Sequence, residues 1–458
     1  MEDWPMEREL FHTMLVPFAA AFSQPGFHNF LLLLEGWLLA GGRAMTSTAL
    51  TALEIYPKHF TSYYRFFSES AWKPDALGVA LIKLVLPLAP EGPVLAVVDD
   101  TLARKTGKHI WGANMHHDPL HWLPNALAFG HNWVVLAIMV DVPLVHRPVA
   151  VPILWRLYRS PKTRAGKTRR GLRERKTVGA ASKTEYRTRP ELAMELLYML
   201  RDALEPDRPI HALGDSTYGG KSVTRNLPAN TIAISRLPMN AALYDLAPPR
   251  RKGQKGCPRK KGKRLPSPKE MAVCQPGWRT ATVHLYGKAV NVRYKTAVVL
   301  WYNSTRTMPV RIVLVRDPKR RRKDDCFFSA NPAMMPEAIL ETYARRWSLE
   351  VAFRDAKQLL GFERSQARTA KAVQRTGPFA FVAYTVTVAW FAQYGHRHYP
   401  DLIPKRPWYR HKRAPSFADM HHILRTLLLQ KDFSHTLENT GPSKNSTTPN
   451  IHVLKQAA

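Results

Sequence analysis

The chain has 458 residues, and its 68 Lys and Arg against 35 Asp and Glu give a formal net charge of +33. Such a basic chain predicts a polyanionic partner, most often nucleic acid; a generally basic proteome and a membrane surface are the alternatives. A hydrophobic content of 45% excludes a disordered basic tail. The three widely separated cysteines form neither a disulfide framework nor a zinc motif.

The first 90 residues predict a helical N-terminal region. Residues 28–39 and 75–86 have the apolar spacing of helices. Between them, the segment from Pro57 to Phe67 mixes basic and aromatic side chains. This mixture suits a helical DNA-binding module, but aromatic residues that pack in a core give the same pattern, so both interpretations stay open.

From residue 93 the pattern becomes that of a mixed sheet with helices packed on it. An apolar strand at 94–98 ends in Asp99 and Asp100. We then predict strands at 133–140 and 149–157, a helix at 190–204, and strands at 210–215 and 231–235. Residues 91–240 and 325–400 are therefore assigned to one α/β unit.

Residues 241–324 are predicted to form a β-rich insertion. A run dense in Lys, Arg and Gly at 250–264 precedes strand-like segments at 280–286, 290–302 and 308–316. After the α/β unit, residues 401–434 are expected to form a basic helical region and residues 435–458 a disordered tail.

Two apolar runs, 30–40 and 379–392, are shorter than the roughly 20 residues that a membrane-spanning helix needs. We interpret both runs as buried helices. The chain is therefore expected to be a cytoplasmic protein that does not bind membranes.

The segment from Tyr343 to Lys357 predicts one continuous helix, because it lacks Pro and Gly and is rich in helix formers. At about 100° per residue, Tyr343, Arg346, Glu350 and Lys357 fall on one polar stripe between apolar neighbours. Polar groups in such a setting must be paired or bound to something. The stripe indicates either a metal and phosphate site or a buried ion-pair network.

Three acids follow one another along the chain at prominent positions. Asp99 and Asp215 are predicted at strand ends, and Glu350 lies on the predicted helix. Taken singly, Asp215 could be a turn or capping residue. Carboxylates are preferred ligands of Mg²⁺, and two such ions can stabilise the attacking and leaving oxygens of a phosphodiester.

These residues resemble the DDE transposases of bacterial insertion sequences, in particular the insertion-sequence-four superfamily. The spacing of Tyr343, Arg346, Glu350 and Lys357 matches the signature of that superfamily at every step. The blocks Val97–Thr101 and Leu213–Asp215 resemble its two aspartate blocks. The resemblance covers residues 93–395 and extends to the β-rich insertion.

The resemblance implies an RNase H-like catalytic core interrupted by the insertion. It implies that Asp99, Asp215 and Glu350 bind two divalent ions, normally Mg²⁺, with Mn²⁺ able to substitute. It also implies that Tyr343, Arg346 and Lys357 contact the transposon-end DNA. With the three acids, these residues make up the expected site.

Two choices remain within the resemblance. The first aspartate block of the family reads Asp, any residue, then Ser or Thr, which selects Asp99, with Asp100 as the second choice. Successive strand residues face opposite sides of a sheet, so only one of the pair should be a ligand. Relatives use an insertion-domain Trp to stack on a flipped base; Trp278 and Trp301 are candidates, and either could instead be plain core.

We expect a cut-and-paste transposase, associated with the bacterial nucleoid, that binds terminal inverted repeats and target DNA as a homodimer. The basic segments 159–175 and 250–264 would follow DNA phosphates. The alternatives are an RNase H-like DNA nuclease without strand transfer and a non-catalytic DNA-binding protein descended from a transposase.

Overall fold

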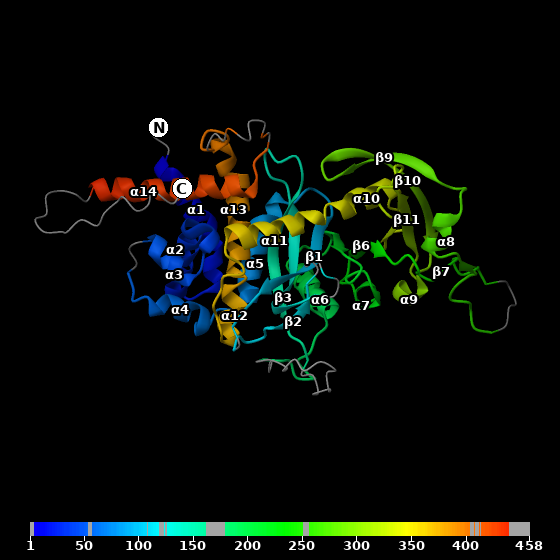
Figure 1. Ribbon diagram of the computed structural model, residues 1–458, viewed down its shortest axis with the longest axis horizontal. Helices are drawn as coiled ribbons and strands as arrows, with labels where there is room; N and C mark the ends of the chain where they lie inside the picture. The colour runs from blue at the N-terminus through cyan, green and yellow to red at the C-terminus, as the bar shows by residue number, and fades with distance from the viewer. Residues whose placement is uncertain are drawn as a thin grey trace, which may run out of the picture.

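The computed structural model describes residues 4–438, apart from 54–56, 108, 119–122, 124–125, 162–178, 251–255, 404–406, 408–411 and 413 (Figure 1). Most of the predicted basic loop 159–175, part of the basic run 250–264 and residues 439–458 of the predicted tail lie outside the described residues.

Helices make up the N-terminal region: α1 (Trp4–Leu15), α2 (Gln24–Ala40), α3 (Thr46–Leu53), α4 (Thr61–Ser68) and α5 (Pro74–Val85). The Ser23 side chain caps α2 by accepting from the Gly26 N–H. Trp37 of α2 packs edge-to-face on Phe379, with ring centroids 5.1 Å apart, and its Nε1 donates to the Leu360 carbonyl. The N-terminal helices are thereby packed onto the rest of the chain.

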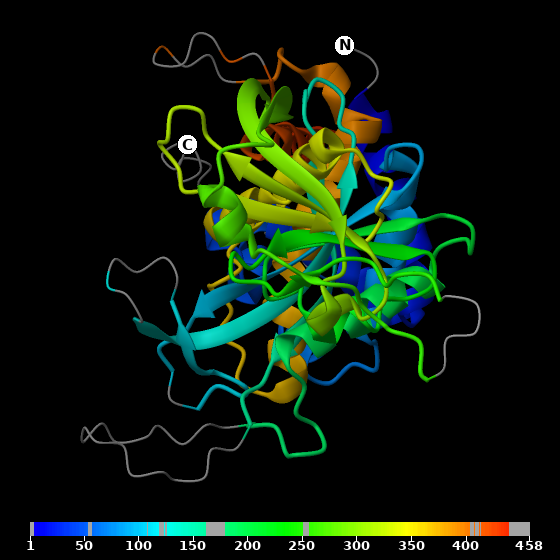
Figure 2. The same ribbon diagram turned by 90° about the vertical axis from the view of Figure 1, so that its right-hand side faces the viewer.

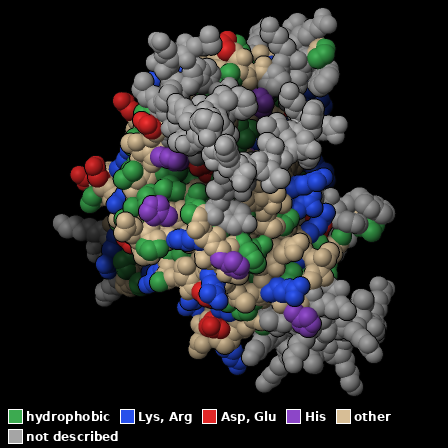
Figure 3. All heavy atoms as spheres, turned by 90° about the vertical axis from the view of Figure 1, so that its left-hand side faces the viewer, with side chains coloured by type: hydrophobic (Ala, Val, Ile, Leu, Met, Phe, Trp, Pro, Cys, Tyr) green, Lys and Arg blue, Asp and Glu red, His purple; other side chains and the backbone are tan. Residues whose placement is uncertain are grey.

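The aromatic segment around α4 is partly buried and partly exposed. Tyr63, Phe66 and Phe67 are buried, whereas Phe60 and Tyr64 remain 47% and 46% exposed. Figure 3 views the end of the molecule where these helices lie, and the Lys and Arg side chains drawn there are spread among uncharged ones. The segment is therefore mostly core, with a small exposed aromatic surface.

A mixed sheet forms the centre of the molecule. Its elements are β1 (Val94–Arg104), β2 (Asn114–His117), β3 (Leu127–Val140), β4 (Val149–Tyr158), α6 (Arg189–Asp202), β5 (Ile210–Gly214), α7 (Lys221–Thr224) and β6 (Thr231–Leu237). The core strands follow the order β4-β3-β1-β5-β6; β4, β3 and β1 are antiparallel neighbours, and β1, β5 and β6 are parallel. The predicted RNase H-like mixed sheet is confirmed.

Helices cover both faces of this sheet. Consecutive residues of β4 point to opposite faces: the Trp155 ring lies 6.5 Å from Phe381 of α13 (Phe379–Gln393), whereas Arg156 pairs with Glu195 of α6. Figure 1 shows α11 (Trp347–Leu359) crossing the core strands beside α13. We call the side covered by α11 and α13 the front face, and the side covered by α6 the back face.

The predicted insertion extends the same sheet. It contains β7 (Leu243–Tyr244), β8 (Arg264–Leu265), α8 (Pro268–Val273), β9 (Arg279–Leu285), β10 (Lys288–Val299), α9 (Tyr302–Thr305) and β11 (Val310–Arg316), followed by β12 (Asp325–Ser329). Because β12 pairs with both β11 and β6, the insertion strands and the core strands form one continuous hydrogen-bonded sheet. Figure 2 shows the strands of this end turned relative to the core strands, as the twist of a large sheet requires.

The C-terminal part corrects two predictions. The helix predicted at 343–357 is two helices, α10 (Pro336–Ala344) and α11, separated by a turn at Arg345 and Arg346. The Arg346 N–H bonds to the carbonyl of Tyr343, three residues back, so the last turn of α10 is tightened and the stripe is interrupted.

The second correction concerns the C-terminal boundary. After α12 (Ala370–Thr376) and α13, helix α14 runs from Phe417 to Glu438, so residues 435–438 of the predicted disordered tail are helical. Among the helices that the structure describes, none combines the length and apolar character needed to cross a bilayer.

Candidate active site

Strand register brings Asp99 and Asp215 together. The parallel pairing of β1 with β5 runs from Val94 opposite Ile210 to Val97 opposite Leu213, and continuing it by two residues puts Asp99 opposite Asp215. Asp99 lies inside β1, which continues to Arg104, so its predicted position at a strand end is wrong. Asp215 does follow the last residue of β5.

The turn after β5 holds Asp215 in place. Its Oδ1 accepts from the Thr217 N–H at 2.8 Å, and its carbonyl accepts from the Ser235 hydroxyl at 2.8 Å. The Asp215 charge reaches Asp99, because it is one of the causes that raise the Asp99 pKa. Two carboxyl groups, one inside β1 and one directly after β5, therefore lie close together.

Arg346 joins Asp99 to Glu350. Its Nη1 contacts Asp99 Oδ2, and its Nη2 donates to Glu350 Oε1 at 2.7 Å. Glu350, whose side chain is 44% exposed, thus reaches Asp99 through a guanidinium. Within the described residues, no three His, Cys, Asp or Glu side chains lie close enough to share a metal ion.

The electrostatics of this cluster favour a cation beside Asp99. Burial raises the pKa of Asp99 to about 7; Arg346 opposes the rise, and Asp100 and Asp215 add to it. Burial alone would lower the pKa of Arg346, but Asp99, Tyr343 and Glu350 outweigh that effect and leave it raised. A desolvated carboxylate needs a neighbouring positive charge in order to stay ionised.

Paired carboxylates are the donors that Mg²⁺ and Mn²⁺ prefer. Asp99 and Asp215 suit a divalent ion for two reasons. Their carboxylate oxygens are hard donors, and a cation between them would relieve the repulsion of their negative charges. Glu350 can join them only when the Arg346 guanidinium leaves the space between Asp99 and Glu350. Asp99 and Asp215 thus fit a metal ion, whereas Arg346 separates Glu350 from Asp99.

Contrary to the prediction from the sequence, Tyr343 and Lys357 do not lie on one stripe with Arg346 and Glu350. Tyr343 packs on Phe327 of β12, with ring centroids 4.6 Å apart, and the Arg346 Cζ lies 5.8 Å from its ring centroid. Lys357 Nζ donates to the Leu102 carbonyl at 2.8 Å and lies 3.4 Å from a Glu363 carboxylate oxygen. Tyr343 and Arg346 therefore stay neighbours, whereas Lys357 turns toward the backbone of β1.

Asp100 points to the back face. Its Oδ1 accepts from the Tyr218 hydroxyl at 2.9 Å, its Oδ2 accepts from Asn132 Nδ2 at 2.8 Å, and Arg189 Nε lies 3.8 Å from Oδ2. Burial, reinforced by the Asp100 charge, raises the pKa of Tyr218, so the phenol remains a donor. The two adjacent aspartates thus face opposite sides, and only Asp99 faces Arg346.

Sequence reasoning missed Tyr218 and Arg236. On β6, Ser235 pairs with Gly214, so the next residue, Arg236, lies beside Asp215. Arg236 Nε donates to Asp325 Oδ1 at 2.6 Å, and its charge interacts with Tyr343 and Arg346. The only signal that could have found Arg236 is the β5–β6 register, which becomes available once the strands are paired.

The two candidate stacking tryptophans differ in setting. Trp301 is buried and packs edge-to-face on Phe328 at 5.3 Å. Trp278 is half-buried, and its ring is approached by Arg316 at 4.0 Å, Lys295 at 5.0 Å and Arg293 at 5.8 Å. Trp301 thus offers no open face, and the Trp278 ring already has cationic neighbours.

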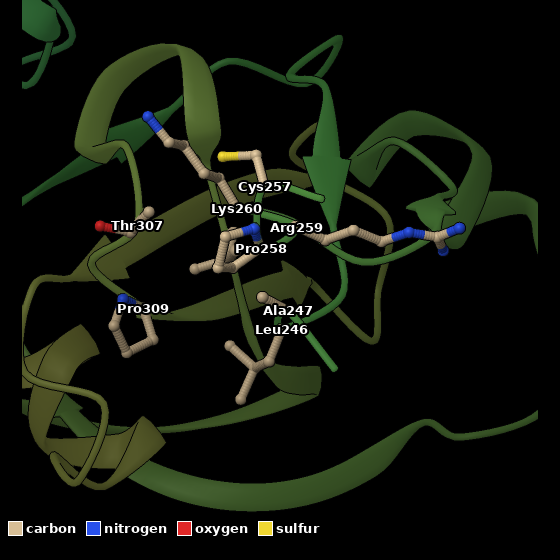
Figure 4. A pocket seen from close by; sticks show the side chains of 9 residues that line it. Leu246, Ala247, Cys257, Pro258, Arg259, Lys260, Thr307 and Pro309 are labelled. Atoms are coloured by element: carbon tan, nitrogen blue, oxygen red, sulfur yellow. The ribbon is translucent and has the colours of Figure 1, made fainter. Parts of the chain in front are cut away.

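A cavity of about 430 Å³ lies in the insertion, away from the acids. Figure 4 shows Leu246 and Pro309 on one side of it and Cys257 and Lys260 on the other, with the Arg259 side chain extending away. None of the site acids lines this cavity. It is therefore separate from the centre formed by Asp99, Asp215 and Arg346.

The sequence of this chain matches a known protein family. Residues 17–306, more than half of the chain, match the model of a family described as DDE superfamily endonuclease. The match includes Asp99 and Asp215 and ends before Glu350. No curated protein matches the chain. A DDE endonuclease is a nuclease-type enzyme that acts on DNA and generally uses divalent metal ions, and this chain belongs to that family.

Proposed function

We propose that this chain is the DNA transposase of a bacterial insertion sequence, of the insertion-sequence-four superfamily type. The observation that carries the proposal is the position of Asp99 beside Asp215, on parallel strands, under the helix that bears Glu350. The family match supports nuclease chemistry at this centre, and the spacing of Tyr343, Arg346, Glu350 and Lys357 supports the finer assignment.

In this proposal Asp99 and Asp215 bind the first divalent ion, and Glu350 completes the binding of two. The ions, Mg²⁺ or in its place Mn²⁺, would lower the pKa of the attacking water and stabilise the leaving oxygen of the phosphodiester. Burial removes most of the water from around the Asp99 carboxylate, and the lower polarity strengthens the attraction of the ionised carboxylate for a cation.

Arg346 is assigned a second role, as a phosphate ligand. Its forked guanidinium suits two phosphate oxygens as well as it suits two carboxylates. Arg236 and Tyr343 both interact with Arg346 and would contact the DNA backbone beside it. Lys357, which now donates to the Leu102 carbonyl, would have to turn outward to reach a phosphate.

The reaction then proceeds in two steps at one centre. Hydrolysis at the element's end frees a 3′ hydroxyl, which later attacks target DNA by transesterification and needs no energy cofactor. Both terminal inverted repeats must be brought together, so we propose a homodimer on DNA in the bacterial nucleoid. The net charge of +33 supports tight, salt-dependent DNA binding.

Replacing the third acid tests the proposal. In a Glu350→Gln variant, cleavage of a labelled duplex carrying the inverted repeats that flank the gene should fall on the order of a thousandfold. Binding of the same duplex should stay within about threefold, because the substitution keeps the size of the side chain. Gel-based cleavage and filter-binding assays measure the two effects.

Glu341→Gln is the matched control. Glu341 lies on the neighbouring helix α10, and its carboxylate accepts from the His284 N–H at 2.8 Å, a bond that an amide oxygen can keep. This variant should cleave like the unmodified chain. Full residual cleavage by Glu350→Gln would remove Glu350 from the centre.

A precut transposon end separates transposition from simple hydrolysis. The transposase should join the free 3′ hydroxyl of such an end to plasmid DNA in the presence of Mg²⁺. Cleavage without joining would favour a nuclease, and binding without any metal-dependent nicking would favour a non-catalytic DNA-binding protein.

A further inference from the structure

The pairing of β1 with β5 ends just before the two aspartates. The last paired residues are Val97 and Leu213, and β5 itself ends at Gly214. At the level of Asp99 and Asp215, ladder hydrogen bonds therefore no longer fix the separation of the two strands. A metal site built on these carboxylates needs another connection at this level.

Tyr218 supplies such a connection on the back face. Its hydroxyl donates to Asp100 Oδ1 at 2.9 Å, and its backbone N–H donates to the Asp215 carbonyl at 3.1 Å and lies 3.4 Å from Asp215 Oδ1. One residue thus contacts the turn that holds Asp215 and the residue next to Asp99.

Both ends of this connection are rigid. Tyr218 is 4% exposed. It packs closely on the end of β5, because a Cβ added at Gly214 would lie only 2.6 Å from the Cβ of Tyr218. Asn132 Nδ2 holds the second Asp100 oxygen at 2.8 Å. The Asp100 N–H in turn donates to Asp99 Oδ1 at 2.9 Å, so a fixed Asp100 also orients the Asp99 carboxylate.

We propose that Tyr218 and Asp100 are positioning residues whose hydrogen bond sets the separation of Asp99 and Asp215 for the binding of a divalent ion. The inference rests on the proposed function, because it takes Asp99 and Asp215 as the metal ligands. Neither Tyr218 nor Asp100 touches the ion or the DNA; they act from the back face through the strand and the turn. Residues that orient metal ligands in this way typically change metal affinity 10- to 100-fold when they are replaced.

The test is direct Mn²⁺ binding to the full chain, measured as free Mn²⁺ by electron paramagnetic resonance. Tyr218→Phe removes only the hydroxyl and should raise the Mn²⁺ dissociation constant by about tenfold. Tyr384→Phe, at an equally buried tyrosine that stacks on Phe417 in the core, should leave the dissociation constant unchanged.

Substitutions at Asp100 test the other end of the bond, even where Tyr218→Phe fails to fold. Asp100→Ala should weaken Mn²⁺ binding as Tyr218→Phe does, and the double variant should be no worse than either single one, because both remove the same contact. Asp100→Asn, in contrast, should keep the Mn²⁺ dissociation constant within about threefold of that of the unmodified chain. The amide oxygen of the new Asn can accept from Tyr218. Its NH₂ can donate to Asn132 Oδ1, which has no hydrogen-bond partner among the described residues and becomes accessible when the Asn132 amide turns over.

A purely structural bond predicts a different result. Tyr218→Phe and Asp100→Ala would then lower the melting temperature and leave the Mn²⁺ dissociation constant unchanged, which would overturn the inference and spare the proposed function. An unmodified chain that binds no Mn²⁺ would overturn the proposed function together with the inference.

Discussion

Asp99 and Asp100 are neighbours on β1, and the contrast between their two surroundings explains the site. Their side chains are similarly buried, at 16% and 21% exposed, so burial does not distinguish them. On the back face Asp100 accepts hydrogen bonds from the neutral donors Tyr218 and Asn132, and the nearest cation, Arg189 Nε, lies 3.8 Å from its Oδ2. Asp99 instead contacts the cation Arg346 directly on the front face, and it also accepts from the backbone N–H of Asp100.

This difference separates a carboxylate that holds the fold from one that can exchange partners. Neutral donors fixed in the core cannot be replaced without leaving buried groups unsatisfied. A guanidinium on a long side chain can move away and be replaced by another cation at the same carboxylate. The front face of β1 is therefore suited to metal binding and the back face to support.

The strongest way to break the comparison is to remove the front-face cation. Arg346→Gln leaves the buried Asp99 without its cationic partner, which should cost about 3 kcal/mol in the free energy of unfolding near pH 8. Mn²⁺ should recover most of that loss, because the ion takes over the charge that Arg346 supplied. The Mn²⁺ dissociation constant should fall about fivefold, since the guanidinium no longer competes. Denaturant unfolding with and without Mn²⁺ measures both effects.

Arg345→Gln is the matched control, because Arg345 is the neighbouring residue and its side chain is exposed. It should change neither the stability nor the Mn²⁺ affinity. If Mn²⁺ cannot restore the stability of the Arg346→Gln variant, Arg346 is a structural partner of Asp99, just as Tyr218 and Asn132 are structural partners of Asp100.

The pH dependence of stability sharpens the comparison with a smaller effect. The pKa of Asp99 is about 7 in the folded chain against an ordinary value of 3.8. Between these values the folded chain binds more protons than the unfolded chain, so the contribution of Asp99 to stability falls as the pH rises and is lost above pH 7. Each pKa unit corresponds to about 1.4 kcal/mol. Because the Asp99 side chain is still 16% exposed and solvent screens part of its interactions, we expect a loss of about 2 kcal/mol from pH 5 to pH 8.

Asp99→Asn should remove that slope, measured by denaturant unfolding in the presence of a chelator. The control is Asp317→Asn in an insertion turn, where the N–H of Lys319 lowers the pKa of Asp317. Asp317 stays ionised throughout this range, so its replacement should leave the slope unchanged. An equal slope in the Asp99→Asn variant would contradict the raised pKa of Asp99.

The sequence predicts the core better than the site. Apolar runs gave the core strands and the buried helix α13, because burial imposes a strong pattern on the residues. The turn at Arg345 and Arg346 was missed, because no Gly or Pro marks it. The roles of Tyr218 and Arg236 depend on which strands pair and in which register, and no spacing along the chain carries that information.

The front face also extends beyond the acids to Arg236 on β6, where the smallest effect is expected. Arg236→Gln removes one cation beside Tyr343, so affinity for the transposon end should fall about three- to tenfold, and the slope of log affinity against log salt should become shallower by about 0.9. The control Arg320→Gln removes an exposed arginine that pairs with Asp324 in the insertion and should change neither quantity. A salt slope that Arg236→Gln leaves unchanged would confine Arg236 to its ion pair with Asp325 and limit the DNA-contacting part of the front face to α10 and α11.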